Sequence, residues 1–257
     1  MKIGLIAQAR MGSSRLPGKM LFPLAGKPVV VHILERLSRC QNVDQVILAT
    51  STASADAPLV AWTEWLGMAC FRGSEEDVLD RFYQAALQYE LDVVGRVCAD
   101  CPFIDPALID AVVQHYLTLN TGGNKCDYLA TFLDRTFPYG VDVEIFSFET
   151  LEKCHKDDID LQSREGVTAH ILTHQDQFQM ANFSGDHDYG HHRWTLDTPD
   201  DFRLISKIYD TLYSIHPEFS WMDVIHLLEQ HPEWSLLNAH VKQREIFLKQ
   251  YRPSAKK

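Results

Sequence analysis

The chain has 257 residues, of which 46% are hydrophobic and 23% charged, and its formal net charge is −11. This balance is typical of a globular protein that buries a sizeable core. The negative charge disfavours nucleic acid as a main partner, because the surface as a whole repels polyanions. A small phosphate ester remains compatible with it, because such a ligand needs only a local cluster of arginine and lysine.

The composition also bears on location. No stretch approaches the roughly 18 apolar residues that a membrane-spanning helix needs, and the first residues lack the pattern of a signal peptide. The six cysteines are scattered along the chain, which is typical of reduced thiols in a protein of this size. We therefore expect a cytoplasmic protein with no membrane partner.

The first half alternates short apolar runs with helical patterns. Strands are predicted at 2–8, 45–50, 68–71 and 92–98. Helices are predicted at 28–40 and at 57–66; a third helix is expected to begin after a cap at Ser74, and a fourth at Asp105. Strands that alternate with helices form a parallel sheet covered by helices on both faces. Such sheets bind ligands beyond the carboxyl ends of their strands.

The second half is less regular. Strands are predicted at 125–132, 139–146 and 193–196, and helices at 148–156, 164–174, 199–214 and 221–250. We found no internal repeat and no break in composition. The sequence therefore predicts an α/β fold with one domain over 1–252, C-terminal helices, and a polar tail at 253–257.

The segment 6–21, IAQARMGSSRLPGKML, has the features of a phosphate-binding loop behind a strand. Gly12 and Gly18 allow backbone N–H groups to approach phosphate oxygens closely. The ATP/GTP-binding P-loop does not fit, because five residues separate these glycines and Met20, rather than Ser or Thr, follows Lys19. This disfavours a phosphate-loop kinase. Arg10, Arg15 and Lys19 instead supply three positive charges to meet a triphosphate.

Two aspartates follow apolar strands without another evident role. Asp105 is explained as a helix cap, and Asp200 and Asp201 as acidic residues at a helix start. Asp100 and Asp197 remain as carboxylates at the ligand edge of the sheet. Two carboxylates near a triphosphate predict Mg²⁺, whose other ligands are phosphate oxygens and water.

Asp142 and Glu144 alternate with valines along a predicted strand and share one face of it. That face is explained equally well by exposure to solvent and by contact with substrate, and both interpretations stay open.

Five segments, considered together, resemble the cytidylyltransferase family, which includes acylneuraminate and 3-deoxy-manno-octulosonate cytidylyltransferases. They are ARMGSSRLPGK at 9–19, FRGSEEDVLDR at 71–81, ADCPFIDP at 99–106, PYGVDVE at 138–144 and RWTLDTPDD at 193–201. The branch they resemble most is that of spore coat polysaccharide biosynthesis protein F. The resemblance implies a nucleotidyltransferase fold of the glycosyltransferase-A type, usually dimeric. It also implies Mg²⁺-dependent transfer of CMP from CTP to a sugar, releasing pyrophosphate.

The resemblance also implies roles for individual residues. Arg10, Arg15 and Lys19 would hold the triphosphate, and Asp100 and Asp197 would bind magnesium. The nucleotide site would be formed by Ala7, Gln8, Ala9, Gly12, Arg72, Ser74, Asp80 and Arg81. The acceptor sugar would face Tyr139, Asp142, Glu144, Arg164 and Glu165. Ala99, Tyr139 and Gly166 depart from the common pattern, and the last two lie on the acceptor side.

Two alternatives remain beside transfer of CMP to a sugar, most naturally a sugar acid. One is a nucleotidyltransferase that uses GTP or another nucleotide with a sugar-1-phosphate or a small phosphorylated acid. The other is a catalytically silent module that binds a nucleotide.

Overall fold

The fold is organised around one seven-stranded sheet with the strand order β5-β4-β1-β6-β8-β7-β9. The computed structural model describes residues 1–243, so the predicted tail 253–257 lies outside the described residues. The strands of the large sheet are β1 Ile3–Gln8, β4 Gln45–Ser51, β5 Ala69–Gly73, β6 Val93–Cys98, β7 Tyr128–Ala130, β8 Glu144–Ser147 and β9 Met180–Asn182. A small hairpin pairs β2 Pro23–Leu24 with β3 Lys27–Pro28.

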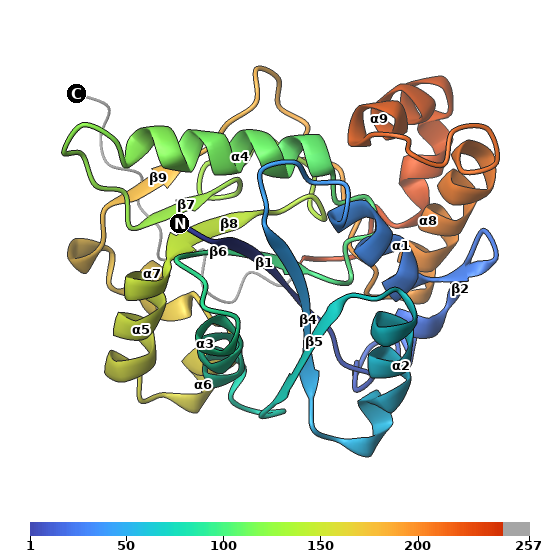
Figure 1. Ribbon diagram of the computed structural model, residues 1–257. Coiled ribbons are helices and arrows are strands. Elements are labelled where there is room, and N and C mark those ends of the chain that lie inside the picture. Colours follow the sequence, from blue (N-terminus) through green and yellow to red (C-terminus); the bar gives the residue numbers. More distant parts are fainter. Residues whose placement is uncertain (244–257) are drawn as a thin grey trace.

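Helices cover both faces of this sheet. They are α1 Val29–Leu37, α2 Ala57–Trp65, α3 Val78–Gln88, α4 Pro106–Leu119, α5 Phe148–Asp157, α6 Leu161–Glu165, α7 Ala169–Thr173, α8 Pro199–Leu212 and α9 Trp221–Gln230. In Figure 1, α4 lies above the sheet while α3, α5 and α6 lie beneath it. Strands β5, β4, β1 and β6 run parallel, and β8 is antiparallel to β6. The predicted mostly parallel α/β sheet is therefore confirmed.

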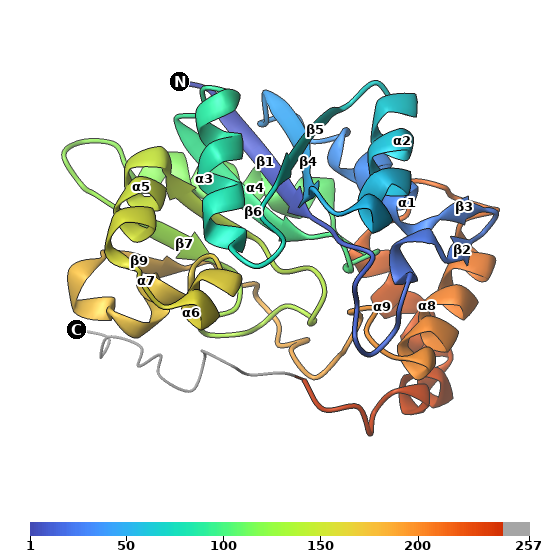
Figure 2. The same ribbon diagram turned by 90° about the horizontal axis from the view of Figure 1, so that it is seen from below.

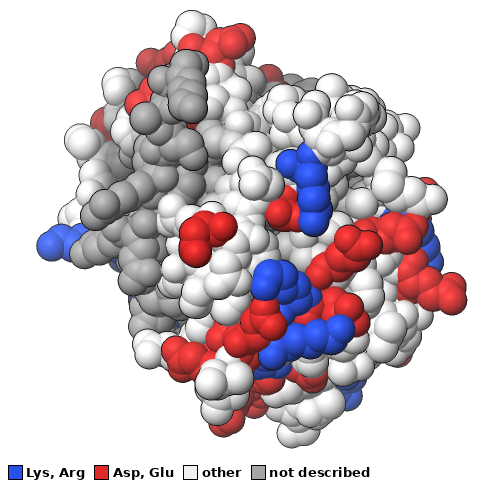
Figure 3. All heavy atoms as spheres, turned by 90° about the vertical axis from the view of Figure 1, so that its left-hand side faces the viewer, with Lys and Arg blue, Asp and Glu red and all other residues white. Residues whose placement is uncertain are grey.

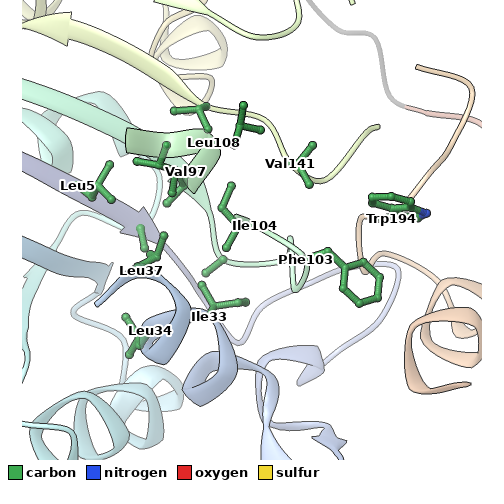
Figure 4. Packing of buried hydrophobic residues seen from close by; sticks show 14 of the residues in the cluster. Leu5, Ile33, Leu34, Leu37, Val97, Phe103, Ile104, Leu108, Val141 and Trp194 are labelled. Atoms are coloured by element: carbon green, nitrogen blue, oxygen red, sulfur yellow. The ribbon is translucent and has the colours of Figure 1, made fainter. Parts of the chain in front are cut away.

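Two hydrophobic cores arise because successive side chains of a strand point to opposite faces. On β1, Leu5 and Ala7 belong to the larger core, whereas Ile6 belongs to the smaller one beside α3. Figure 4 shows Leu5 and Val97 facing the leucines of α1, with the Phe103 and Trp194 rings at the far end of this core. Burial on both sides makes the sheet a rigid platform for its loops.

The carboxyl ends of β1 and β6 lie next to each other. Gln8, the last residue of β1, is in register with Cys98, the last residue of β6. The long loop that follows β1 and the turn that carries Asp100 therefore leave the sheet at the same edge. Figure 2 shows this loop, in blue, running alongside the orange α8.

The second half differs from its prediction in several places. The expected strand 139–146 is ordered as β8 only from Glu144, and 125–132 only at 128–130. The segment 193–196 forms a single bridge between Arg193 and Tyr139 instead of a strand. The first two pieces still pair with regular strands, β8 with β6 and β7, and β7 with β9, whereas the bridge lies outside the strands. Strand β9 had no sequence prediction.

Helix boundaries differ as well. The predicted helix 164–174 is two helices, α6 and α7, because the chain breaks at Val167, whose φ is 58°. Helix α9 ends at Gln230, ahead of Pro232, and the end of the predicted helix 221–250 lies outside the described residues. The cap of α3 is Asp77, whose side chain accepts from the Asp80 amide; Ser74 accepts from the Asp77 amide one turn earlier. Within residues 1–243, no helix has the length and apolar character to cross a membrane.

Candidate active site

A cleft of about 190 Å³ opens at the edge where β1 and β6 end. Its walls come from β1 and its loop, from α3, from the turn after β6, from α6 and from the segment before α8. Nine of the residues predicted for the site line it: Gln8, Ala9, Arg10, Arg15, Lys19, Arg81, Asp100, Glu165 and Asp197. The fold thus brings together segments that are up to 189 positions apart in the chain, from Gln8 to Asp197.

Lys19 lies between the two aspartates that the sequence singled out. Its Nζ is 2.7 Å from Asp100 Oδ2 and 3.0 Å from Asp197 Oδ1. Asp197 Oδ2 in turn accepts from Arg15 and from Arg193, both at 2.9 Å. The carboxylates of Asp100 and Asp197 therefore face each other across a single cation.

The charges of this cluster reinforce one another. Burial by itself lowers the pKa of Lys19, but Asp100 and Asp197 raise it, and the balance lies above the ordinary value of 10.5. Burial by itself raises the pKa of Asp197, but Lys19, Arg193 and Arg15 bring it below the ordinary value of 3.8. Lys19 and Asp197 are consequently both ionised at neutral pH.

Asp197 owes its position to the start of α8. Thr198 caps this helix, and its side chain and the Asp201 side chain each accept from the other's backbone amide. Asp201, which is fully buried, also holds the Arg193 guanidinium at 3.1 Å. Arg193, which is not among the residues that line the cleft, in turn contacts Asp197. Arg193 was missed as a site residue, although its position four residues before Asp197 places the two charges within reach.

The loop after β1 is tied to the neighbouring strand by Asp56. Asp56 Oδ1 accepts from the Met11 amide at 2.7 Å, and Oδ2 accepts from the hydroxyls of Thr50 and Ser51 at the end of β4. Burial favours the neutral acid, but these hydrogen bonds outweigh it and lower the pKa of Asp56 below 3.8. Asp56 was also missed, because its polar surroundings in the sequence resemble an ordinary turn.

The cleft carries more cations than carboxylates. Among the described residues, Arg10, Arg15, Lys19 and Arg81 line it, against Asp100, Glu165 and Asp197. Arg10 pairs with Glu165 at 3.1 Å. Arg81 is only 2% exposed, and its Nε and Nη1 atoms have no hydrogen-bond partner within residues 1–243. Burial, together with the charge of Arg10, lowers the pKa of Arg81 to about 10. An unpaired buried guanidinium beside an excess of positive charge suits an anionic ligand.

The remaining residues predicted for the nucleotide lie at different depths. Gln8 Oε1 accepts from Arg96 Nε at 3.1 Å, so the amide of Gln8 has a fixed orientation. Ala7 is fully buried within the larger core. Arg72 donates to the backbone carbonyl groups of Ser51, at the end of β4, and of Ala53, and Asp80 accepts from His155 at 2.9 Å. Arg72 and Asp80, like Gly12 and Ser74, are outside the lining of the cleft.

Of the five residues predicted for the acceptor, Glu165 alone lines the cleft. Glu144 is 4% exposed and binds Arg96, Tyr128 and Thr168. Asp142 pairs with Arg135 at 2.6 Å, and the Arg135 guanidinium lies 3.7 Å from the centre of the Tyr139 ring. Arg164 binds Asp77 at 2.8 Å. The face shared by Asp142 and Glu144 is therefore mostly occupied by internal ion pairs.

The two facing carboxylates fit Mg²⁺ together with a phosphate ligand. Among the described residues, no group of three or more His, Cys, Asp and Glu side chains could hold a metal ion by itself. Mg²⁺ is commonly bound by one or two carboxylates, with phosphate oxygens and water completing its ligands. Asp100 and Asp197 supply oxygen donors of that kind next to a cluster of cations.

The surface outside the cleft has a different charge pattern. Figure 3 shows acidic and basic side chains close together on the left-hand side of the molecule in Figure 1. On α5, Lys153 pairs with Asp157 and Lys156 with Glu152. Such compensated charges attract a polyanion weakly, in contrast to the surplus of cations in the cleft.

Comparison with known proteins bears directly on this site. The sequence profile of the cytidylyltransferases matches residues 4–247. The chain belongs to the cytidylyltransferase family. This cytidylyltransferase is 30% identical over 235 residues to the spore coat polysaccharide biosynthesis protein SpsF of Bacillus subtilis, a match that covers 89% of this chain and 94% of SpsF. It is 34% identical over 113 residues to the 3-deoxy-manno-octulosonate cytidylyltransferase of Geobacter metallireducens, which covers 44% of each chain.

The fold agrees with the family. The structure of a cytidylyltransferase from Leptospira borgpetersenii matches 91% of this chain and 96% of its own, with a TM-score of 0.86 and 30% sequence identity. The resemblance predicted from five sequence segments is confirmed, and the protein is a nucleotidyltransferase.

Proposed function

We propose that this cytidylyltransferase transfers CMP from CTP to a sugar acid in a Mg²⁺-dependent reaction that releases pyrophosphate. The product is an activated sugar for a surface polysaccharide or another glycan. The names of SpsF and of the 3-deoxy-manno-octulosonate enzyme support this choice of nucleotide and acceptor. The observation that carries the proposal is the convergence of Lys19, Asp100 and Asp197 at the edge of the sheet.

In this proposal, a hydroxyl oxygen of the acceptor attacks the α-phosphorus of CTP in line with the departing group, and the hydroxyl proton is released to solvent. The bond from the α-phosphorus to the oxygen that bridges to the β-phosphate breaks, and pyrophosphate carries away the electron pair. Arg10, Arg15 and Lys19 bind the non-bridging oxygens and stabilise the charge that builds up on pyrophosphate. Loss of one such contact costs roughly 3 kcal/mol, about 100-fold in rate. Asp100 and Asp197 would hold Mg²⁺, which would supply Lewis acidity and orient the phosphates.

Arg81 and Gln8 also line the cleft. Within residues 1–243, Nε and Nη1 of Arg81 have no hydrogen-bond partner. The side-chain carbonyl oxygen of Gln8 accepts from Arg96, which leaves the Gln8 amide nitrogen to donate. Both suit the acceptor atoms of the nucleoside. Glu165 and Arg10, which pair on the wall supplied by α6, are placed to meet the acceptor or the phosphates.

The test is a coupled pyrophosphate-release assay with Mg²⁺, each of the four nucleoside triphosphates, and a panel of nonulosonic acids, other sugar acids and sugar phosphates. We expect turnover with CTP and a sugar acid. Turnover restricted to GTP with a sugar-1-phosphate supports the first alternative, and nucleotide binding without pyrophosphate release supports a silent module.

The matched variants are Asp100→Asn and Asp210→Asn. Asp100→Asn should reduce pyrophosphate release at least about 100-fold while the protein still folds, because this side chain is partly exposed. Asp210 is exposed on α8, outside the residues that line the cleft, so its variant should match the wild type. Near-normal turnover of Asp100→Asn contradicts the metal role. The homodimer implied by the family resemblance stays a prediction for sedimentation analysis.

A further inference from the structure

Lys19 has a geometry that a phosphate-binding residue alone does not require. It is 7% exposed, and its ammonium group contacts both carboxylates of the proposed metal site. A metal ion shared by Asp100 Oδ2 and Asp197 Oδ1 has to lie between these two oxygens, about 2.1 Å from each. Lys19 Nζ lies between the same oxygens, at 2.7 and 3.0 Å. Two cations cannot occupy this position together.

We propose that Lys19 and a divalent cation are alternative counterions of the Asp100–Asp197 pair. Nucleotide phosphates then draw Lys19 away from the carboxylates and make room for the metal ion. The role of the nucleotide rests on the proposed function, whereas the competition between Lys19 and metal depends on the geometry of this chain alone. Lys19 thereby couples the two binding events.

Arg15 belongs to the same exchange, whereas Arg193 does not. Arg15 lines the cleft, is about one-third exposed and contacts Asp197 Oδ2, so it can also turn toward phosphate oxygens. Arg193 contacts the same oxygen but is buried and held by Asp201. When Lys19 and Arg15 leave, Arg193 continues to orient Asp197. The Asp197 carboxylate thus stays paired with Arg193 through Oδ2, and Oδ1 becomes available to the metal ion.

Such an exchange couples the two ligands thermodynamically. Without nucleotide, a metal ion must displace the Lys19 ammonium from two short ion pairs, which weakens its apparent affinity. Once a polyanion binds Lys19, that competition disappears and the metal affinity rises. Linkage requires the converse, so the metal ion must raise nucleotide affinity by the same factor.

The experiment measures Mn²⁺ binding to the full chain without nucleotide, by the electron paramagnetic resonance signal of free Mn²⁺. We expect Lys19→Met to bind Mn²⁺ at least about tenfold more tightly than the wild type. Arg10→Met is the matched control, because Arg10 lines the same cleft but pairs with Glu165. Its affinity should change by less than about threefold. Lys27→Met, which removes an ammonium paired with Glu35 away from the cleft, should leave the affinity unchanged.

A double variant assigns the bound ion to this site. The gain of Lys19→Met should disappear in Lys19→Met/Asp100→Asn, and a gain that persists there contradicts the proposal. Equal affinities of Lys19→Met and Arg10→Met also overturn it, because they leave only a general effect of charge. Should Lys19→Met fail to fold, Lys19→Gln is measured instead, with the Mn²⁺-dependent rise in Tm as a second readout.

These outcomes are separable from those of the activity assay. Failure of the wild type to release pyrophosphate with any nucleotide refutes the proposed function, whatever the Mn²⁺ titrations give. A wild type that is active with CTP while Lys19→Met shows no gain in Mn²⁺ affinity refutes the counterion exchange alone.

Discussion

Glu144→Gln decides whether Glu144 serves the acceptor, as the family resemblance implied, or the fold. One of its carboxylate oxygens accepts from Arg96. The other accepts from Tyr128 Oη at 2.8 Å and Thr168 Oγ1 at 2.5 Å. Burial lowers the pKa of Arg96, but the charge of Glu144 reverses this and raises it above the ordinary value. The variant keeps the shape of the side chain but leaves the Arg96 charge uncompensated in the interior.

Removal of one partner from a buried ion pair costs roughly 3–5 kcal/mol. The side chains of Arg96 and Glu144 are 13% and 6% exposed, so solvent offers little compensation here. For a domain of this size, each kcal/mol lowers Tm by about 2–4 °C. We therefore expect Glu144→Gln to lower Tm by roughly 6–20 °C.

The assay is calorimetric melting, combined with KM for the acceptor at a temperature where the variant is folded. Arg96→Met/Glu144→Leu should recover part of the lost stability, because it removes the stranded charge together with its partner. The hydroxyls of Tyr128 and Thr168 would still lack their acceptor, so recovery should be incomplete. A variant that melts like the wild type while its acceptor KM rises tenfold would show that Glu144 is a substrate ligand and that the structural interpretation is wrong.

Two further predictions concern the support of Asp197. Gly140→Ala should destabilise the fold and lower activity, because φ of Gly140 is 105° and a Cβ atom there would lie 2.7 Å from the carbonyl carbon of Trp194. Thermal melting measures the loss of stability, and a variant as stable as the wild type would contradict the prediction. Asp197→Asn should alter the acid side of the stability profile. Burial raises the pKa of Asp197, but Lys19, Arg193 and Arg15 bring it below 3.8 in the fold. Its ionised form therefore adds stability that is present above the ordinary pKa and lost as the pH falls through the lowered value. Tm measured from about pH 5 down to 2 should decline less steeply for Asp197→Asn, and parallel curves would refute the linkage.

The first half of the fold was predictable because its signals are strong and local. Apolar runs of strand length alternate with amphipathic helices, and β1, β4, β5 and β6 lie close to their predicted ranges. Asp105, followed by Pro106, begins α4 as expected. Asp100 was identified as a carboxylate left over at the end of a strand, and it does follow β6. Asp197 was identified in the same way, but the segment before it forms a single bridge, and the Leu196 amide, which donates to the Asp100 carbonyl oxygen, brings Asp197 close to Asp100.

The second half was less predictable because tertiary contacts decide its local structure. A bridge replaces the strand predicted at 193–196, and a residue with positive φ divides a helix that appeared continuous. Partners distant in sequence were also not accessible to pattern analysis. The hydrogen bond from the Met11 amide to Asp56 and the ion pair of Glu144 with Arg96 have no local sequence pattern. Each joins residues that are distant in sequence and are brought together only by the fold.

Asn238 supports the surroundings of Asp197 from a position well past the last strand. Its side-chain amide donates to the Arg193 carbonyl oxygen and to Asp201 Oδ1, each at 2.9 Å. A shortened protein that stopped before this residue would keep the whole sheet and every residue of the cleft. It would lose the hydrogen bonds that hold Arg193 and Asp201 next to Asp197. A shortened protein for expression should therefore retain Asn238, because this residue holds Arg193 and Asp201, and Arg193 contacts Asp197. The end of the sheet is not a sufficient guide to the C-terminal boundary.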